Sequence, residues 1–222
     1  MDRRRLLRGA AAAAAAGVLL PTARAQARPE PGGSAAEIPA AGAADRAAGR
    51  TDATTDLAAA DVDYPLADWA PATSANYTAA SRPSSYPVDY VVVHITQETF
   101  ADTVTIFQNP ARQVSAHYVV RSSDGHVAQC VRERNVAWHA GNWDYNTRSI
   151  GIEHEGWVDK PGYFTRELYA RSAALTASVC DRYGIPKDRA HIIGHNEVPG
   201  ATHSDPGPHW DWVRYIRMVN LT

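Results

Sequence analysis

Val91-Val92-Val93-His94 is the stretch of sequence that decides the fold. Three β-branched valines in a row favour a strand, and an unbroken apolar run indicates a strand that is buried on both faces. We therefore predict a strand at 89–94 that carries an imidazole at its end. A lone histidine at such a position is often only a hydrogen-bonded core residue, so the role of His94 depends on which other residues join it.

Gly194–Pro208 supplies those other residues. It holds His195 and Asp205, and the Pro199-Gly200 pair between them favours a turn that lets the chain fold back. A catalytic zinc site usually has three protein ligands and leaves one position for water. With His94 these residues form a His/His/carboxylate set, the ligand mix expected for a hydrolytic zinc ion. The sequence thus predicts one Zn²⁺ per chain.

Residues 150–155 alternate between apolar and acidic side chains. In a strand, Ile150 and Ile152 would point to one side, and Glu153 and Glu155 to the other. A carboxylate in mid-strand is costly when it is buried and unpaired, but facing a cleft it could take a proton from water. The alternative is an acidic, solvated face of an edge strand.

An aromatic and polar stretch runs from Trp138 to Trp143. It includes His139 and Asn142, and Gly141 would let a ligand approach the backbone. Such a stretch suits a wall that contacts sugars or peptides. The alternative is an aromatic loop that packs on the core.

The remaining pattern alternates strands with helices. Ser123-Asp124-Gly125 is a hairpin signal between two strands, and Thr165 and Gly184 are suited to cap a long helix. The expected strands are 89–94, 115–120, 126–131, 149–154 and 190–195, and the expected helices are 99–107, 165–183 and 211–221. This order predicts an α/β or α+β fold, with a single mixed β-sheet flanked by helices.

The first 25 residues are typical of an export signal. Arg3-Arg4-Arg5 precedes an apolar run at 9–20, and Ala23-Arg24-Ala25 fits a cleavage site with small residues. The paired arginines before two leucines favour a twin-arginine signal, and an ordinary secretory signal is the alternative. We therefore expect a secreted, extracytoplasmic protein of bacterial type.

Residues 26–63 are rich in Ala, Pro and Gly, which predicts a flexible linker because too little apolar surface can be buried. Residues 64–222 then form one domain of ordinary size. Removing 1–25, with five arginines and one aspartate, changes the formal net charge from −2 to −6. An acidic domain has no electrostatic reason to bind nucleic acid, and we expect no membrane contact after the signal is removed.

The chain has two cysteines, Cys130 and Cys180. An oxidising compartment would permit a disulfide between them, provided that the long helix packs on the hairpin. Two buried thiols are the alternative.

Six short motifs occur together between about residues 88 and 212. They are Val92-Val93-His94, Val114-Ser115-Ala116-His117-Tyr118, Ala137-Trp138-His139-Ala140-Gly141, Ser149-Ile150-Gly151-Ile152-Glu153, Gly194-His195 and Asp205-Pro206-Gly207-Pro208. In this order they resemble the zinc-dependent N-acetylmuramoyl-L-alanine amidases of type 2. That family includes the animal peptidoglycan recognition proteins and the amidase-type phage lysozymes.

The resemblance implies roles for particular residues. His94, His195 and Asp205 would bind zinc, and Glu153 would activate the water. The cytosolic bacterial members of the family usually carry a lysine where this chain has His203, so His203 becomes a candidate for stabilising the oxyanion. The candidate substrate-binding residues are His117, Trp138, His139 and Asn142.

The sequence therefore predicts a monomeric peptidoglycan hydrolase that cleaves the amide between N-acetylmuramic acid and the L-alanine of the stem peptide. One alternative is a module that binds muropeptides without cleaving them, but such modules commonly lack a zinc ligand. Another is a zinc endopeptidase acting within the stem peptide. The helix-borne H-E-x-x-H pattern of zinc proteases does not occur in this chain.

Overall fold

The computed structural model describes residues 62–222. The predicted export signal at 1–25 lies outside the described residues, as does the predicted linker except for its last two residues. Asp63, one of those two, donates its amide to Gln129 Oε1 at 2.6 Å and accepts from the Glu133 amide at 2.9 Å. Within 62–222, no helix is both long and apolar enough to cross a bilayer.

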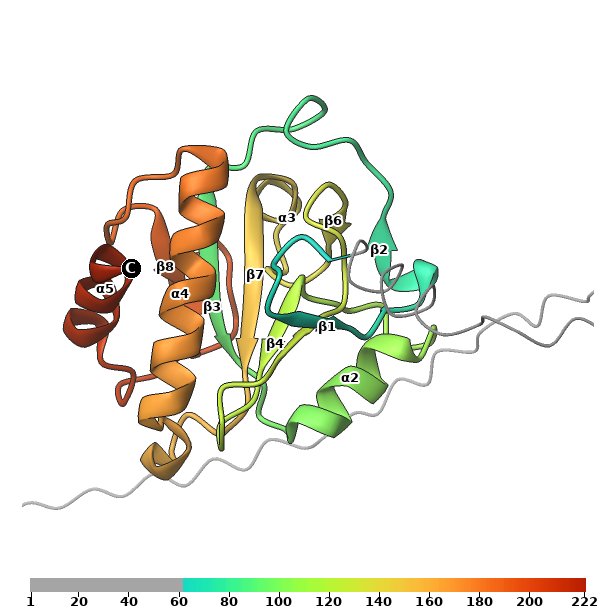
Figure 1. The fold of residues 1–222 in the computed structure, drawn as a ribbon. Helices are drawn as coiled ribbons and strands as arrows, with labels where there is room; N and C mark the ends of the chain where they lie inside the picture. The colour runs from blue at the N-terminus through green and yellow to red at the C-terminus, as the bar shows by residue number, and fades with distance from the viewer. Residues whose placement is uncertain (1–61) are drawn as a thin grey trace, which may run out of the picture. The chain divides into compact units, whose positions relative to one another are not determined.

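A six-stranded mixed sheet forms the centre of the domain (Figure 1), and its strand order is β1-β5-β4-β7-β3-β8. The strands are β1 (Ala67–Trp69), β3 (Tyr90–Ile95), β4 (Tyr118–Val120), β5 (Val127–Gln129), β7 (Ser149–His154) and β8 (Ile192–Gly194). A two-stranded sheet pairs β2 (Tyr77–Thr78) with β6 (Val136–Ala137). The expected mixed sheet is thus confirmed.

Strand β3 runs parallel to both of its neighbours, β7 and β8. His94 pairs with Glu153 of β7, and Val93 pairs with Gly194 of β8. Carboxyl ends of parallel strands lie at the same edge of a sheet, which is where open α/β sheets bind ligands. His94, Glu153 and the residue after Gly194 are therefore brought to one place by strand pairing alone.

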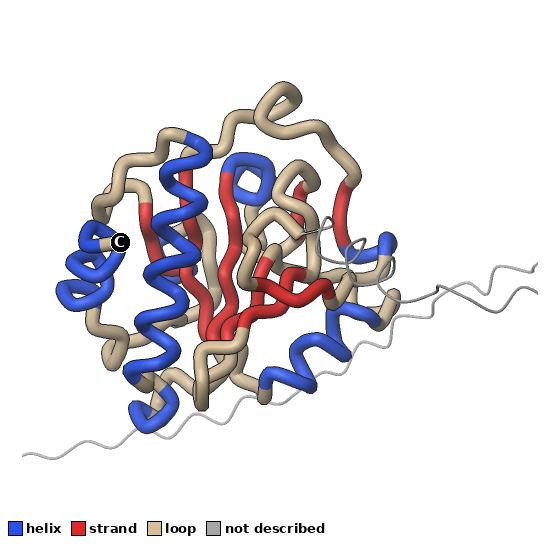
Figure 2. The backbone as a smooth tube through the Cα atoms, in the orientation of Figure 1, coloured by secondary structure: helices blue, strands red, loops and turns tan. Residues whose placement is uncertain are grey.

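Four helices flank the sheet in the described part of the chain. They are α2 (Phe100–Gln108), α3 (Trp143–Arg148), α4 (Arg166–Tyr183) and α5 (Trp212–Leu221). The short 3₁₀ turns are η1 (Ser74–Asn76), η2 (Pro161–Tyr163) and η3 (His195–Glu197). Helices α4 and α5 lie side by side, and α4 packs against the sheet at β3 and β4 (Figures 1 and 2).

Helix α4 begins and ends as its sequence indicates. The Thr165 hydroxyl accepts from the Leu168 amide, and Gly184 adopts φ 69° at the C-terminal cap, a left-handed conformation that suits glycine. Leu168 and Leu175 are fully buried against the sheet. At about 25 cal/mol per Å² of apolar area removed from water, burial of each such leucine stabilises the fold by about 2 kcal/mol.

The two faces of the sheet have different chemistry, because side chains alternate along a strand. On one face, Val91, Val93 and Ile152 pack into the core beneath α4. On the opposite face of the same strands lie His94 and Glu153. This division leaves one face for stability and the other for a site.

A buried polar chain links the core to the backbone of His94. His154 Nδ1 lies 2.8 Å from the His94 carbonyl, so that nitrogen must donate, and Nε2 lies 2.6 Å from Ser172 Oγ on α4. Ser172 and Thr176 both contact the Tyr215 hydroxyl at 2.7 Å. Burial lowers the pKa of His154 to about 3, which keeps the ring neutral and the chain satisfied.

Several expected elements differ at their ends. The strand expected at 115–120 begins only at Tyr118, and the strand expected at 190–195 ends at Gly194, after which His195 opens η3. Helix α3 and strand β1 were not expected. Both are short and lack a clear periodic pattern, so their sequences carry little signal.

Both cysteines are buried free thiols in the structure, with no disulfide between them. Cys130 packs with Ala116, Val119 and other residues beneath α2, whereas Cys180 belongs to the core on the α4 side. The sheet lies between these two clusters. Burial raises the pKa of each thiol to about 12, so the reactive thiolate is scarce at neutral pH.

We predict that both thiols resist alkylation in the folded protein and react only after unfolding. The protein would be purified without reductant and treated with iodoacetamide at pH 8, with and without guanidinium. Mass spectrometry should find no label in native protein and two labels after unfolding. Finding a Cys130–Cys180 disulfide in the unfolded, unreduced sample would contradict the structure.

Candidate metal centre

Three buried side chains converge at the carboxyl edge of the sheet. His94, His195 and Asp205 each offer one ligand atom, and these atoms all lie within 4.8 Å of one another. His94 Nδ1 is 3.3 Å from Asp205 Oδ2, and His195 Nδ1 is 3.1 Å from Asp205 Oδ1. The structure thus assembles the three residues that the sequence analysis selected as metal ligands.

The loop after β8 closes so that Asp205 reaches the histidines. The Asn196 amide donates to the Asp205 carbonyl at 2.9 Å, which joins the two ends of the loop. Gly200 at the loop's far end has φ 80°, a conformation that side-chain-bearing residues rarely adopt. The predicted fold-back at Pro199-Gly200 is therefore confirmed by the structure.

The protonation states of the site suit a metal. Burial lowers the pKa of His94, despite the opposing influence of the neighbouring Asp205 carboxylate, and favours the neutral ring. Burial opposes ionisation of Asp205, but the hydrogen bond with His195 and the nearby His94 ring outweigh it and hold the pKa of this carboxyl below its ordinary value. Neutral imidazole and ionised carboxylate are the forms that bind a cation.

The spacing of the donors also fits a small cation. In a tetrahedral zinc site with bonds of about 2.0–2.1 Å, neighbouring ligand atoms are separated by about 3.3 Å. His94 Nδ1 lies 3.3 Å from one Asp205 oxygen and His195 Nδ1 lies 3.1 Å from the other, and one ligand atom from each residue lies within 4.8 Å of the others, a spacing that a single small cation can span. The residues therefore fit a zinc ion.

Glu153 lies beside this group on β7, paired with His94. Its Oε2 atom is buried and has no hydrogen-bond partner among the described residues. Burial, and then the charge of Asp205, raise the pKa of Glu153 well above its ordinary value. Glu155 differs, because its carboxylate accepts from the Phe100 amide at 3.0 Å and the Ser122 amide at 2.8 Å. Of the two, only Glu153 is available for proton transfer.

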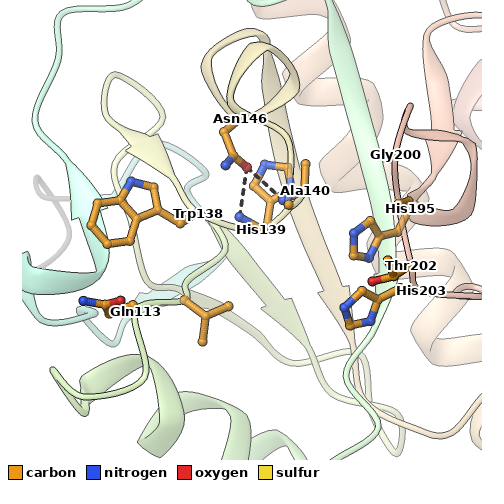
Figure 3. A pocket seen from close by; sticks show the side chains of 12 residues that line it. Gln113, Trp138, His139, Ala140, Asn146, His195, Gly200, Thr202 and His203 are labelled. Carbon is orange, nitrogen blue, oxygen red and sulfur yellow. Dashed lines mark hydrogen bonds between the residues drawn. The ribbon is translucent and has the colours of Figure 1, made fainter. Parts of the chain in front are cut away.

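A cavity of about 530 Å³ opens onto the site. Figure 3 shows Trp138 and Gln113 on one side, and His195, Thr202 and His203 on the other. This volume lies in the range of small-molecule sites.

His203 lies on the exposed loop that lines this cavity. Its ring stacks on that of His195, with centroids 4.7 Å apart and planes 17° from parallel. The imidazole thus borders both the metal ligands and the open cavity, a position from which it can reach a bound substrate.

Two of the predicted substrate-binding residues line the cavity and two do not. Trp138 and His139 do, although both His139 nitrogens are already engaged by His94 and Ser149. His117 is fully buried, with Nδ1 accepting from the Gly151 amide and Nε2 2.6 Å from Arg82 Nη2. The structure therefore gives His117 a structural role in place of the predicted substrate contact, because no part of its ring is accessible.

Asn142 is likewise committed to the fold. Its Oδ1 accepts from the Tyr145 amide and caps α3, and its Nδ2 donates to the Pro199 carbonyl. Asn146 lines the cavity instead, and its Oδ1 accepts from the amides of His139 and Ala140 (Figure 3). Sequence reasoning missed Asn146 and Gln113. The one local sign was Asn142, a residue suited to cap a helix that begins at Trp143. Asn146 would then lie one turn into that helix, close to the loop that precedes it.

Comparison with known proteins agrees with this geometry. The family model described as N-acetylmuramoyl-L-alanine amidase matches residues 84–208. N-acetylmuramoyl-L-alanine amidase A of Achromobacter lyticus is 37% identical over 176 residues, which cover 72% of this chain and 96% of that protein. The 1,6-anhydro-N-acetylmuramyl-L-alanine amidase AmpD of Escherichia coli K12 is 38% identical over 114 residues, covering 49% of this chain and 60% of AmpD.

Solved structures give the same result. A crystal structure of a selenomethionine derivative of AmpD aligns with a TM-score of 0.58 and 28% identity, covering 70% of this chain and 96% of that chain. The amidase AmiD of E. coli, in complex with anhydro-N-acetylmuramic acid-L-Ala-D-γ-Glu-L-Lys, aligns with a TM-score of 0.52 and 26% identity, covering 61% of this chain and 59% of that chain. The chain therefore belongs to the N-acetylmuramoyl-L-alanine amidases of type 2.

Proposed function

We propose that this protein is a secreted, zinc-dependent amidase. It hydrolyses the amide between the lactyl group of N-acetylmuramic acid and the L-alanine of the stem peptide. The observation that carries the proposal is the convergence of His94, His195 and Asp205 beside the unpartnered carboxylate of Glu153. The Achromobacter lyticus amidase, which matches most of this chain, supports the reaction.

His94, His195 and Asp205 would hold the zinc ion. When bound, zinc supplies a Lewis acid that polarises the scissile carbonyl and makes water a stronger acid. Asp205 is hydrogen-bonded to the Ile95 amide at 3.3 Å, and both histidines contact its oxygens. These contacts hold the donors together before any ligand arrives, which lowers the ordering cost of binding.

Glu153 acts as the general base and then as the general acid. It takes a proton from the attacking water and returns it to the amine of L-alanine as the amide bond breaks. A carboxyl whose pKa is raised towards the working pH can serve in both directions, because neither form is far too stable.

The cavity would bind the muropeptide. Trp138 offers an aromatic face, and its Nε1 donates to Thr78 Oγ1 at 3.0 Å, which fixes the ring. Gln113 is exposed beside it and carries free polar atoms at a left-handed backbone position, φ 50°. The AmiD complex with a muropeptide supports this class of ligand.

His203 would donate a hydrogen bond to the oxyanion that forms on the scissile carbonyl. Its exposed ring and its stacking on His195 place it at the cavity wall beside the ligands. The imidazole is shorter than the lysine that cytosolic bacterial members usually carry at this position, and its stacking on His195 holds the ring beside the metal ligands.

The location and partners of the protein are proposed from its sequence. We propose export through the signal at 1–25 and action as a monomer on peptidoglycan or its muropeptides, with no nucleic acid and no membrane as partner. A net charge of −6 after removal of the signal is consistent with this choice.

A muropeptide-binding module and a zinc endopeptidase remain the alternatives. The complete ligand set with Glu153 beside it favours catalysis over binding. Incubating the protein with purified muropeptides and sequencing the new amino termini separates the three. An amidase frees L-alanine termini, an endopeptidase frees termini within the stem, and a binding module frees none.

His195 and Asp205 are two of the three proposed zinc ligands. Changing both His195 and Asp205 to alanine should reduce bound zinc from one ion per chain to nearly none, measured by metal analysis after dialysis. Added zinc should then no longer raise the melting temperature, because stabilisation requires binding to the folded state. His191→Ala with Asp188→Ala removes a His–Asp pair outside the site and serves as the control. Full zinc retention by the first variant would exclude this ligand set.

The base prediction concerns Glu153→Gln, which keeps the shape of the side chain and removes its charge. We expect kcat to fall by about 10²-fold or more, with zinc content unchanged. Stability should be equal or higher, since a buried carboxylate without a partner is costly. Glu155→Gln is the matched control, which should lose stability but little activity. Near-normal turnover by Glu153→Gln would show that another group activates water.

The oxyanion prediction concerns His203→Ala. We expect kcat to fall by about 10²-fold, the usual effect of losing one oxyanion donor, with KM and zinc content little changed. His203→Lys should recover part of the activity, and His209→Ala, an exposed histidine of the same loop, should have no effect. Equal rates for His203→Ala and the wild type would leave His203 as a structural loop residue.

A further inference from the structure

His94 is held between two groups that favour opposite positions for its proton. Nδ1 lies 3.3 Å from Asp205 Oδ2, and Nε2 lies 2.9 Å from Nδ1 of His139. A neutral imidazole carries one proton, which can sit on either nitrogen. In the absence of other contacts, the carboxylate would draw the proton to Nδ1, the nitrogen that must be free to bind a metal.

The hydrogen bonds beyond His139 decide the direction. The Tyr145 carbonyl can only accept, so Ser149 Oγ, 2.5 Å away, donates its single proton there. Ser149 Oγ can then only accept from His139 Nε2, which lies 3.2 Å from it. With its proton on Nε2, neutral His139 offers a lone pair at Nδ1. His94 must therefore donate from Nε2, which leaves its own Nδ1 unprotonated.

The ring of His139 is fixed in this position by its surroundings. A side chain at Gly151 would place a Cβ atom 2.5 Å from the His139 ring, so only glycine leaves room for it. The Asn146 side chain holds the His139 and Ala140 amides at 3.0 and 2.8 Å. The rings of His94 and His139 meet edge to face, with centroids 5.0 Å apart.

We propose that His139 is a positioning residue that sets the tautomer of His94, through the chain from Tyr145 by way of Ser149, so that Nδ1 of His94 faces the metal site as a lone pair. The inference rests on the proposed zinc-dependent function. It explains why a histidine that lines the substrate cavity has both ring nitrogens committed to the protein. Groups that orient a metal-binding histidine in this way typically change metal affinity by 10–100-fold when lost.

The test compares His139→Leu with His139→Asn in the exported form of the chain. Asparagine places an acceptor, Oδ1, about where Nδ1 of histidine lies, whereas leucine fills similar space with no acceptor. Zinc affinity would be measured by competition with a chelator, and folding by the melting temperature of the metal-free protein. We expect leucine to weaken zinc binding by about 10–100-fold and asparagine to stay near the wild type.

A second readout needs no metal. Nitrogen NMR of the histidine side chains in metal-free protein should place the His94 proton on Nε2 in the wild type and in His139→Asn. In His139→Leu it should move to Nδ1, towards Asp205. If His139→Leu does not fold, Ser149→Ala tests the same chain, because His139 Nε2 then loses its acceptor; zinc affinity should again fall.

Several outcomes would overturn the inference: unchanged zinc affinity in a folded His139→Leu variant, equal losses in the leucine and asparagine variants, or a wild-type His94 protonated on Nδ1. Failure of the proposed function looks different. A wild-type protein that binds no zinc would exclude zinc dependence, and the NMR measurement would still decide the direction of the hydrogen bonds.

Discussion

The register of β3 between two parallel neighbours is the constraint on which the rest of the structure depends. It sets His94 beside Glu153 and ends β8 where His195 must follow. A shift of one residue in this pairing would turn each side chain of β3 to the opposite face. His94 would then enter the core beneath α4, and Val93 would occupy the site. The apolar packing of Val91 and Val93 thus maintains the geometry of the site.

Polar groups on the two sides of this sheet are handled differently. On the α4 side, His154 is buried, but both of its nitrogens are satisfied, by the His94 carbonyl and by Ser172. On the cavity side, Glu153 Oε2 and His195 Nε2 are buried without partners in the described chain. In the described residues a third such atom, Trp210 Nε1, lies in the core on the α4 side. Unsatisfied buried groups are destabilising, and the two that meet beside the metal ligands mark the place where stability is given up for reactivity.

Elements with a strong periodic pattern were predictable. The strand expected at 149–154 has those bounds in the structure, and Thr165 and Gly184 cap α4 as their side-chain chemistry indicates. Strand β1 was not predictable, because Ala67–Trp69 is three residues long and forms a strand only by pairing with β5, 60 residues later in the chain. The disulfide alternative could not be decided either, since it depends on which side of the sheet each cysteine faces.

For the site, the sequence by itself determined the residue types that do the chemistry. Two histidines, an aspartate and a glutamate stand in positions that local rules bring to strand ends and to a turn. Tertiary structure alone decided that His117 is buried beside Arg82 and that His139 lies over Gly151 against His94. The physical reason is that the ability of a residue to bind a metal depends on the chemistry of its side chain, which the sequence gives directly. The orientation of that side chain depends on hydrogen bonds and steric contacts between segments far apart in sequence, which exist only after folding.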